Sequence, residues 1–168
     1  GGGGNDGESY TLPWYFAARH TKTDSFEKHG KKGFLFTMGD EPYLDILSRS
    51  AIEKFIGDPI QTDLSARELL VEVSRQYEVY HLMIEEGYGM IYEKEHVMRQ
   101  WTGLLGDRAI LVSDVTKIPE IIVSILEIAA GKDAKEVIDS WDGSTAIAVR
   151  TAVGKLSAVN ASEDLIEF

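Results

Sequence analysis

Three short apolar runs, separated by stretches with helical spacing, constrain the fold of this chain more than any other feature. They lie at residues 34–37, 77–84 and 109–112. These runs lack the apolar–polar alternation of a strand with one solvated face, so they are typical of strands buried on both sides. Parallel strands are joined by right-handed helical crossovers. The pattern therefore predicts an α/β fold in which helices cover both faces of a parallel sheet.

Recurring apolar residues also mark the helices between these strands. Leu44, Leu47 and Ala51 share one helical face, which predicts a helix that begins near Tyr43 and ends at Gly57. A capping box formed by Ser65 and Glu68 predicts the start of the next helix, and Gly87-Tyr88-Gly89 is typical of a loop. Further helices are expected around Trp14–His20, Val97–Leu104, Ile118–Ile128, Ala134–Trp141 and Ser144–Leu156. Pro119 is expected in the first turn of the helix at Ile118–Ile128.

The net charge of the chain limits the kinds of molecule that it is expected to bind. The chain has 17 Lys and Arg residues against 28 Asp and Glu residues, a formal net charge of -11. Such a surface repels phosphate backbones, so we do not expect nucleic acid as a partner. No membrane span is expected either, because no window approaches the roughly 18 to 20 uninterrupted apolar residues that one requires. Cysteine is absent from the sequence, which excludes disulfides and thiolate chemistry. We expect a cytoplasmic protein with one domain over residues 1–156 and an acidic tail over residues 157–168.

The chain opens on four glycines followed by Asn5 and Asp6. Such a run is found in linkers and expression scars, but it also forms internal loops of longer chains. Because the glycines lead directly into the helix expected at residues 14–20, we favour an internal loop. The prediction is that an upstream segment is missing or that the chain belongs to a larger assembly.

Ligand sites in open α/β sheets lie beyond the carboxyl ends of the strands. This rule singles out residues 38–42, 85–90 and 113–116. Asp40 and Glu41 directly follow the first apolar run, where a carboxylate could help to hold Mg²⁺. The alternative is that one of them caps the helix expected near Tyr43.

A second oxygen-rich segment follows the opening glycines. Asn5, Asp6 and Glu8 could fold around an ion, or they could be solvated residues of a chain terminus. The other motifs of the sequence do not indicate a metal or catalytic site. His81, in an apolar run, is predicted to be a hydrogen-bonded core or edge residue, and no zinc-protease, nucleophile-elbow or phosphate-loop motif occurs in the sequence.

Together these segments resemble the von Willebrand factor A domain, in its bacterial type. The resemblance covers roughly residues 1–130. It rests on the acidic glycine loop at residues 3–8, the aromatic and alanine-containing helix at 14–20, and the run Phe34–Asp40 that ends in Thr-Met-Gly-Asp. The resemblance implies a Rossmann-like, three-layer αβα fold that is incomplete at its N-terminal side.

The resemblance also implies a function. Domains of this family bind a partner protein through a metal-ion-dependent adhesion site, usually with Mg²⁺, and are not enzymes. Asp40 matches the family's third-loop aspartate, and Asp6, or else Asn5, lies near the second-loop position. Glu8 and Glu41 would then face the partner.

The chain departs from the family pattern in two respects. It contains no Asp-x-Ser-x-Ser motif, and the loop between Gly1 and Glu8 has no threonine, so the metal site is incomplete in these residues. Two alternatives therefore remain open. One is a Mg²⁺-dependent enzyme of phosphoryl transfer or hydrolysis on a doubly wound fold. The other is a metal-free structural subunit.

Overall fold

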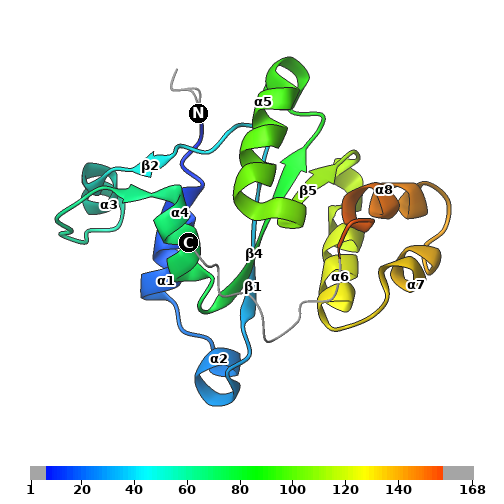
Figure 1. The fold of residues 1–168 in the computed structure, drawn as a ribbon, viewed down its shortest axis with the longest axis horizontal. Helices are drawn as coiled ribbons and strands as arrows, with labels where there is room; N and C mark the ends of the chain where they lie inside the picture. The colour runs from blue at the N-terminus through cyan, green and yellow to red at the C-terminus, as the bar shows by residue number, and fades with distance from the viewer. Residues whose placement is uncertain (1–6, 157–168) are drawn as a thin grey trace.

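The computed structural model describes residues 7–156, and within them a parallel sheet forms the centre of the fold (Figure 1). Its strands are β1 (Gly33–Gly39), β4 (Tyr77–Ile84) and β5 (Ala109–Val112), in the order β1-β4-β5. Both pairings are parallel. The predicted α/β class and parallel sheet are therefore confirmed, and the three strands coincide with the three apolar runs.

The register of the strands brings their carboxyl ends to one edge of the sheet. Gly39 at the end of β1 pairs with Met83, and Val112 at the end of β5 pairs with Ile84. We call this the carboxyl edge. The central strand β4 is buried along its whole length except at Ile84, because it has a neighbour on each side and helices on both faces.

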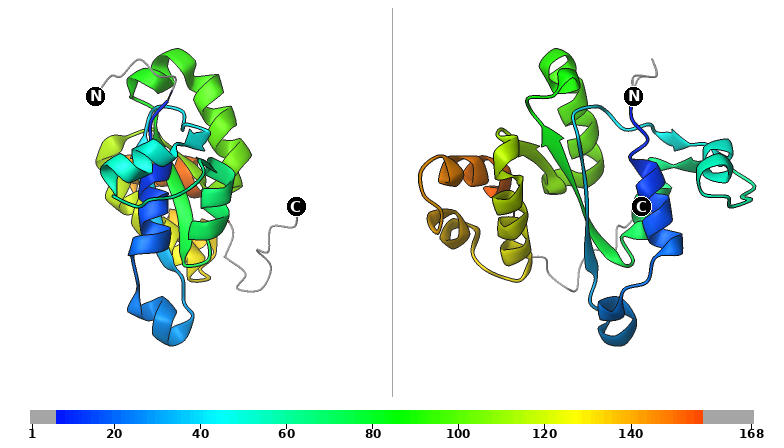
Figure 2. Two further views of the ribbon diagram at one scale, coloured as in Figure 1. Left: turned by 90° about the vertical axis from the view of Figure 1, so that its left-hand side faces the viewer. Right: turned by 180° about the vertical axis from the view of Figure 1, so that it is seen from behind.

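Helices cover both faces of the sheet (Figures 1 and 2). One face carries α1 (Thr11–His20), α4 (Ala66–Val73) and α5 (Tyr88–Leu105), which share a core with Val79 and Met83 of β4. The other face carries α6 (Ile118–Ala129), α7 (Ala134–Asp139) and α8 (Gly143–Val153), which pack around Tyr80 and Leu82. Alternate residues of the strand thus supply two separate cores.

The prediction of a helix that begins near Tyr43 is wrong. The structure has β2 (Ile46–Leu47), paired antiparallel with β3 (Leu64–Ser65), and then α3 (Arg49–Phe55). The reason is local, since the Ser48 hydroxyl accepts the Ala51 N–H at 3.2 Å and so starts the helix only after Ser48. A short helix, α2 (Asp24–His29), also lies in a stretch for which no helix was predicted.

Other local predictions hold. Ser65 and Glu68 form the reciprocal capping box at the start of α4. Pro119 lies in the first turn of α6, where a proline costs no intrahelical hydrogen bond. Gly87-Tyr88-Gly89, predicted as a loop, instead opens α5.

Among the described helices, none is long and apolar enough to cross a membrane.

Strand β1 lies at the rim of the sheet. Within residues 7–156 it pairs only with β4, and its other edge carries no strand (Figure 2). Phe34 and Met38 of β1 are 38% and 49% exposed. An apolar edge strand of this length is a template for a further strand.

Candidate functional site

The carboxyl edge is built from the loops that follow β1, β4 and β5. The first of these loops is bound directly to the start of α5. The Asp40 carboxylate accepts the Gly89 N–H at 3.0 Å. A Cβ atom at Gly87 would lie 2.1 Å from the Asp40 Cβ, so only glycine at this position lets the two loops approach so closely. Asp40 is therefore a capping residue, but for α5 and not for a helix near Tyr43.

The segment that precedes α1 lies against the same loop. The Glu8 N–H donates to the Pro42 carbonyl at 2.8 Å, and the Leu44 N–H donates to the Glu8 carbonyl at 3.2 Å. Gly7 is buried directly against Pro42. Two segments more than thirty residues apart in the sequence therefore meet beside Asp40, and the Glu8 side chain is exposed there.

The Tyr10 side chain, which follows the first of these segments, packs against Gly39 at the end of β1. Its hydroxyl lies so close to Gly39 that a Cβ atom there would be 1.9 Å away. Burial raises the pKa of Tyr10 to about 12, and the charges of Glu8, Asp40 and Glu41 add to the rise. The backbone contacts of Glu8, and the packing of Tyr10 against Gly39, place the segment before α1 beside the loop that contains Asp40 and Glu41.

Helix α5 also fixes the backbone of the loop between Glu41 and Tyr43. The Trp101 indole N–H donates to the Glu41 carbonyl at 3.1 Å. The Gln100 side chain accepts the Tyr43 N–H at 2.9 Å and donates to the Tyr43 carbonyl at 3.1 Å. Because side chains satisfy these backbone groups, the loop has a defined conformation in the absence of regular secondary structure.

His81 lies beneath this loop in the core. Its ring stacks on Trp101 with centroids 3.5 Å apart, and its Nδ1 lies 2.9 Å from the Thr37 Oγ1. The prediction of a hydrogen-bonded core histidine is confirmed. Burial lowers the pKa of His81 to about 3, because the charged imidazolium would lose its hydration. His81 is thus a neutral, structural residue at physiological pH.

The loops after β4 and β5 complete the carboxyl edge. Glu85 forms an ion pair with Lys94 of α5. The Asp114 carboxylate accepts the Thr116 hydroxyl at 2.6 Å and the Thr116 N–H at 2.9 Å, which lowers the pKa of Asp114. Asp114 therefore caps the turn that follows β5.

Three of the predicted site residues lie among the described residues, and two do not. Asp40 and Glu41 lie in the loop that follows β1, and the backbone of Glu8 is hydrogen-bonded to that loop at Pro42 and Leu44. Asn5 and Asp6 lie outside the described residues, although Gly7 lies beside the loop that contains Asp40. In residues 7–156 no group of three or more His, Cys, Asp or Glu side chains is arranged to hold a metal ion. Those residues alone do not make a complete site for Mg²⁺.

Tyr10 was not singled out from the sequence, and the roles of Gly39 and Gly87 were not predicted although both lie in segments that were. All three matter because of close approaches between distant segments, which a sequence does not display. One signal was present. Two glycines on either side of an aromatic residue, directly after a buried strand, indicate a tight approach of the backbone, and here they admit Asp40.

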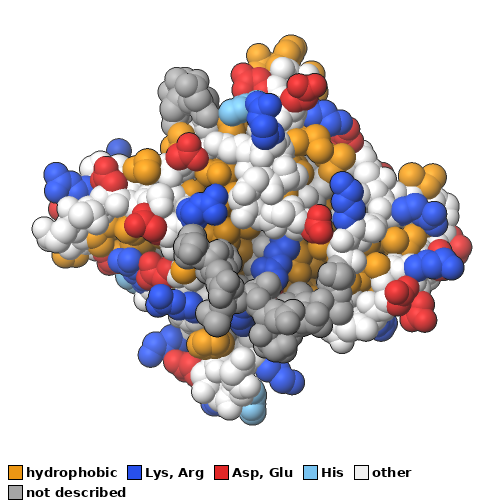
Figure 3. Space-filling model, in the orientation of Figure 1, with side chains coloured by type: hydrophobic (Ala, Val, Ile, Leu, Met, Phe, Trp, Pro, Cys, Tyr) orange, Lys and Arg blue, Asp and Glu red, His pale blue; other side chains and the backbone are white. Residues whose placement is uncertain are grey.

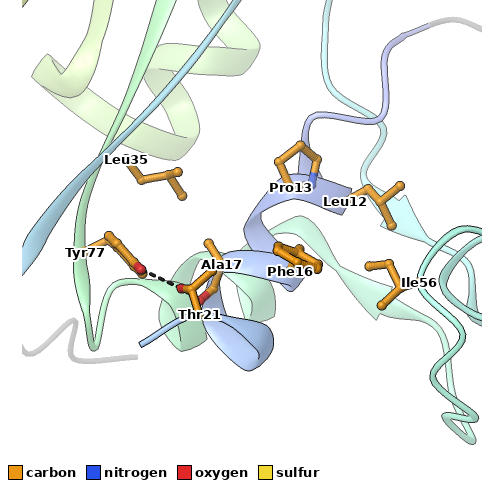
Figure 4. Close-up of a pocket in the computed structure, with 8 residues that line it drawn as sticks. All are labelled: Leu12, Pro13, Phe16, Ala17, Thr21, Leu35, Ile56 and Tyr77. Carbon is orange, nitrogen blue, oxygen red and sulfur yellow. Dashed lines mark hydrogen bonds between the residues drawn. The ribbon is translucent and has the colours of Figure 1, made fainter. Parts of the chain in front are cut away.

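A separate apolar pocket lies between α1 and the amino halves of β1 and β4 (Figure 4). It has a volume of about 490 Å³. The Tyr77 hydroxyl is hydrogen-bonded to Thr21 at 2.5 Å, so the pocket's polar groups bind each other. Its lining residues are Leu12, Pro13, Phe16, Ala17, Thr21, Leu35, Ile56 and Tyr77. None of these residues is a His, Asp, Glu, Lys or Cys.

Comparison with known proteins finds no family model, no curated protein and no solved structure that matches this chain.

Proposed function

We propose that this chain is a non-catalytic protein-interaction module of the von Willebrand factor A type. It binds a partner protein through the carboxyl edge of its sheet, with a divalent cation, Mg²⁺, held in part by Asp40. The partner meets the edge at Glu8 and Glu41. The observation that supports the proposal is that the backbone of Glu8 is hydrogen-bonded to the loop that follows β1 and contains Asp40 and Glu41.

The position of these carboxylates supports the proposal. They lie beyond the carboxyl ends of parallel strands, where open α/β sheets bind their ligands. Asp40 uses one carboxylate oxygen, Oδ2, for the Gly89 N–H, which fixes its orientation and leaves Oδ1 for another partner. Mg²⁺ commonly uses one or two protein carboxylates and keeps several waters, so Asp40 is a suitable ligand.

The remaining oxygen ligands must come from outside the described residues. Strand β1 has a free edge within residues 7–156. A further parallel strand paired with that edge would end beside Asp40, because parallel strands share one carboxyl edge. Residues that follow such a strand, together with Asp6 or Asn5, would complete the site. This explains how an incomplete set of ligands fits a cation-binding function.

Thermal unfolding of the intact full-length protein with Mg²⁺ or Mn²⁺, compared with unfolding in chelator, tests the proposal. A cation that binds only the folded chain stabilises it by about 2.7 kcal/mol at a hundredfold excess over Kd. For a chain of this size that corresponds to a rise in Tm of roughly 5–10 °C. We expect Asp40→Asn to abolish the rise, because the amide is a poorer ligand but still accepts the Gly89 N–H.

Asp114→Asn is the matched control. Asp114 lies at the same edge but is bound to Thr116. This variant should keep the full rise in Tm. An intact full-length protein whose Tm does not respond to either cation would refute the cation site, and so would an Asp40→Asn variant that responds like the wild type.

A further inference from the structure

The first turn of α5 exposes three large hydrophobic side chains beside the carboxyl edge. Tyr88, Ile91 and Tyr92 are 73%, 63% and 69% exposed. The two tyrosine rings contact each other, with centroids 4.4 Å apart. We call Tyr88, Ile91 and Tyr92 the α5 tip patch. Figure 3 shows hydrophobic and acidic side chains next to one another at this end of α5.

The patch is held rigidly although its side chains are exposed. Met90, in the same turn, is 1% exposed and anchors the turn to the core. Asp40 accepts the Gly89 N–H, and the Ile91 N–H donates to the Gly87 carbonyl at 3.0 Å. The helix is interrupted at Glu93, where φ is -130°, so this turn is oriented separately from the rest of α5. A fixed turn that exposes two tyrosines loses little conformational entropy when it binds a partner.

Carboxylates surround the patch. Asp40 and Glu41 contact the glycines on either side of Tyr88, since a Cβ atom at Gly89 would lie 3.3 Å from the Glu41 Cγ. Glu86 directly precedes the turn, and Glu85 before it is paired with Lys94 of α5. Exposed aromatic residues are typical hot spots of protein interfaces, and tyrosine faces attract cations. Carboxylates at the rim add electrostatic attraction for the same kind of group.

We propose that the α5 tip patch binds an Arg- or Lys-bearing protein segment whose apolar side chains cover Ile91 while its cationic groups meet the tyrosine rings and the surrounding carboxylates. This inference rests on the proposed function and names the chemistry of the partner at that edge. The net charge of -11 favours the same choice, because an acidic chain attracts cationic segments over long range.

Synthetic peptides test the inference. The probes are two short peptides of equal length, one with Arg and Leu in a serine background and one with Glu in place of every Arg. Binding to the 168-residue chain is measured by calorimetry in the presence of chelator, and the contact surface is mapped by NMR of the backbone amides. We expect the Arg peptide to bind at least about tenfold more tightly, a difference of 1.4 kcal/mol. Raising the salt concentration should weaken this binding.

Variants locate the binding surface. Tyr88→Ser combined with Tyr92→Ser should weaken binding of the Arg peptide by about tenfold or more. Phe55→Ser combined with Ile147→Ser is the matched control, because Phe55 and Ile147 are 65% and 69% exposed on other helices. The inference is overturned if the Glu peptide binds as tightly as the Arg peptide, or if the tyrosine variant binds the Arg peptide like the control.

The same variants separate this inference from the cation proposal. The double tyrosine variant should keep the Mg²⁺-dependent rise in Tm, and Asp40→Asn should keep most of its affinity for the Arg peptide. If Mg²⁺ has no effect but the Arg peptide binds at Tyr88 and Tyr92, only the cation site is refuted. If Mg²⁺ stabilises the chain but the Arg peptide does not bind, only the inference about the patch is refuted.

Discussion

The Asp40 carboxylate accepts a hydrogen bond from the Gly89 N–H across 3.0 Å, and this contact ties the end of β1 to the first turn of α5. It joins residues 49 positions apart in the sequence. The contact also links the two proposals, since Asp40 orients both the acidic edge and the turn that exposes Tyr88 and Tyr92.

Replacing Asp40 separates its structural role from its charge. Asp40→Ala removes the acceptor for the Gly89 N–H and should lower the free energy of unfolding by roughly 0.5–2 kcal/mol, as the loss of a helix cap does. Asp40→Asn keeps an oxygen acceptor and should cost less than about 0.5 kcal/mol. Urea denaturation of both variants measures the difference. Equal losses for Ala and Asn would mean that the charge stabilises the fold, not the hydrogen bond.

Gly87 is required for the close approach of the two loops. In Gly87→Ala the new Cβ would meet the Asp40 Cβ at 2.1 Å, so we expect a loss of about 1–3 kcal/mol as the loops separate. Gly103→Ala is the control, because a Cβ atom there meets nothing within 4 Å and the residue lies inside α5. That variant should gain up to about 1 kcal/mol. A Gly87→Ala variant as stable as Gly103→Ala would contradict the observed packing.

His81 makes the stability of the chain depend on pH. The pKa of His81 is about 3 in the folded state and near 6.5 in the unfolded state. At pH values between these two, the unfolded state therefore binds a proton that the folded state does not. The contribution of the neutral His81 ring to the free energy of unfolding is therefore fully present above pH 6.5. This contribution falls by about 1.4 kcal/mol per pH unit as the pH is lowered towards 3.

The variant His81→Gln isolates this effect. It should be less stable than the wild type at pH 7, because it loses the stacking on Trp101. Its stability should nevertheless fall less steeply between pH 6.5 and pH 3, so the two curves converge. Denaturant titrations at several pH values check this. Parallel curves would show that His81 already carries a proton in the folded state or does not titrate in this range.

The edge of β1 that carries no strand within residues 7–156 should make the isolated chain self-associate. Met38 is 49% exposed on this strand, and Met38→Lys places a charge where a second strand would pack. We expect this variant to remain monomeric at higher concentrations than the wild type, as measured by light scattering after gel filtration. Ile147→Lys, on α8, should behave like the wild type. Equal self-association of the wild type and Met38→Lys would place the contact elsewhere.

The sequence determined the features that depend on neighbouring residues. The limits of β4 and β5, the capping box of Ser65 and Glu68, and Pro119 in the first turn of α6 all follow from periodicity and local hydrogen bonding. The carboxyl edge itself was also predictable, because parallel strands end on the same side of a sheet. The helix expected at Tyr43 failed because Leu44 and Leu47 fit a helical spacing by coincidence, while Ser48 starts the helix later.

Only the tertiary structure decided what the residues of that edge contact. Which N–H the Asp40 carboxylate accepts, how closely Tyr10 approaches Gly39, and which side chains of the Gly87–Tyr92 turn remain exposed depend on segments that lie far apart in the sequence. Such contacts are set by how the helices and strands pack against one another. Local propensity and spacing carry no information about that packing.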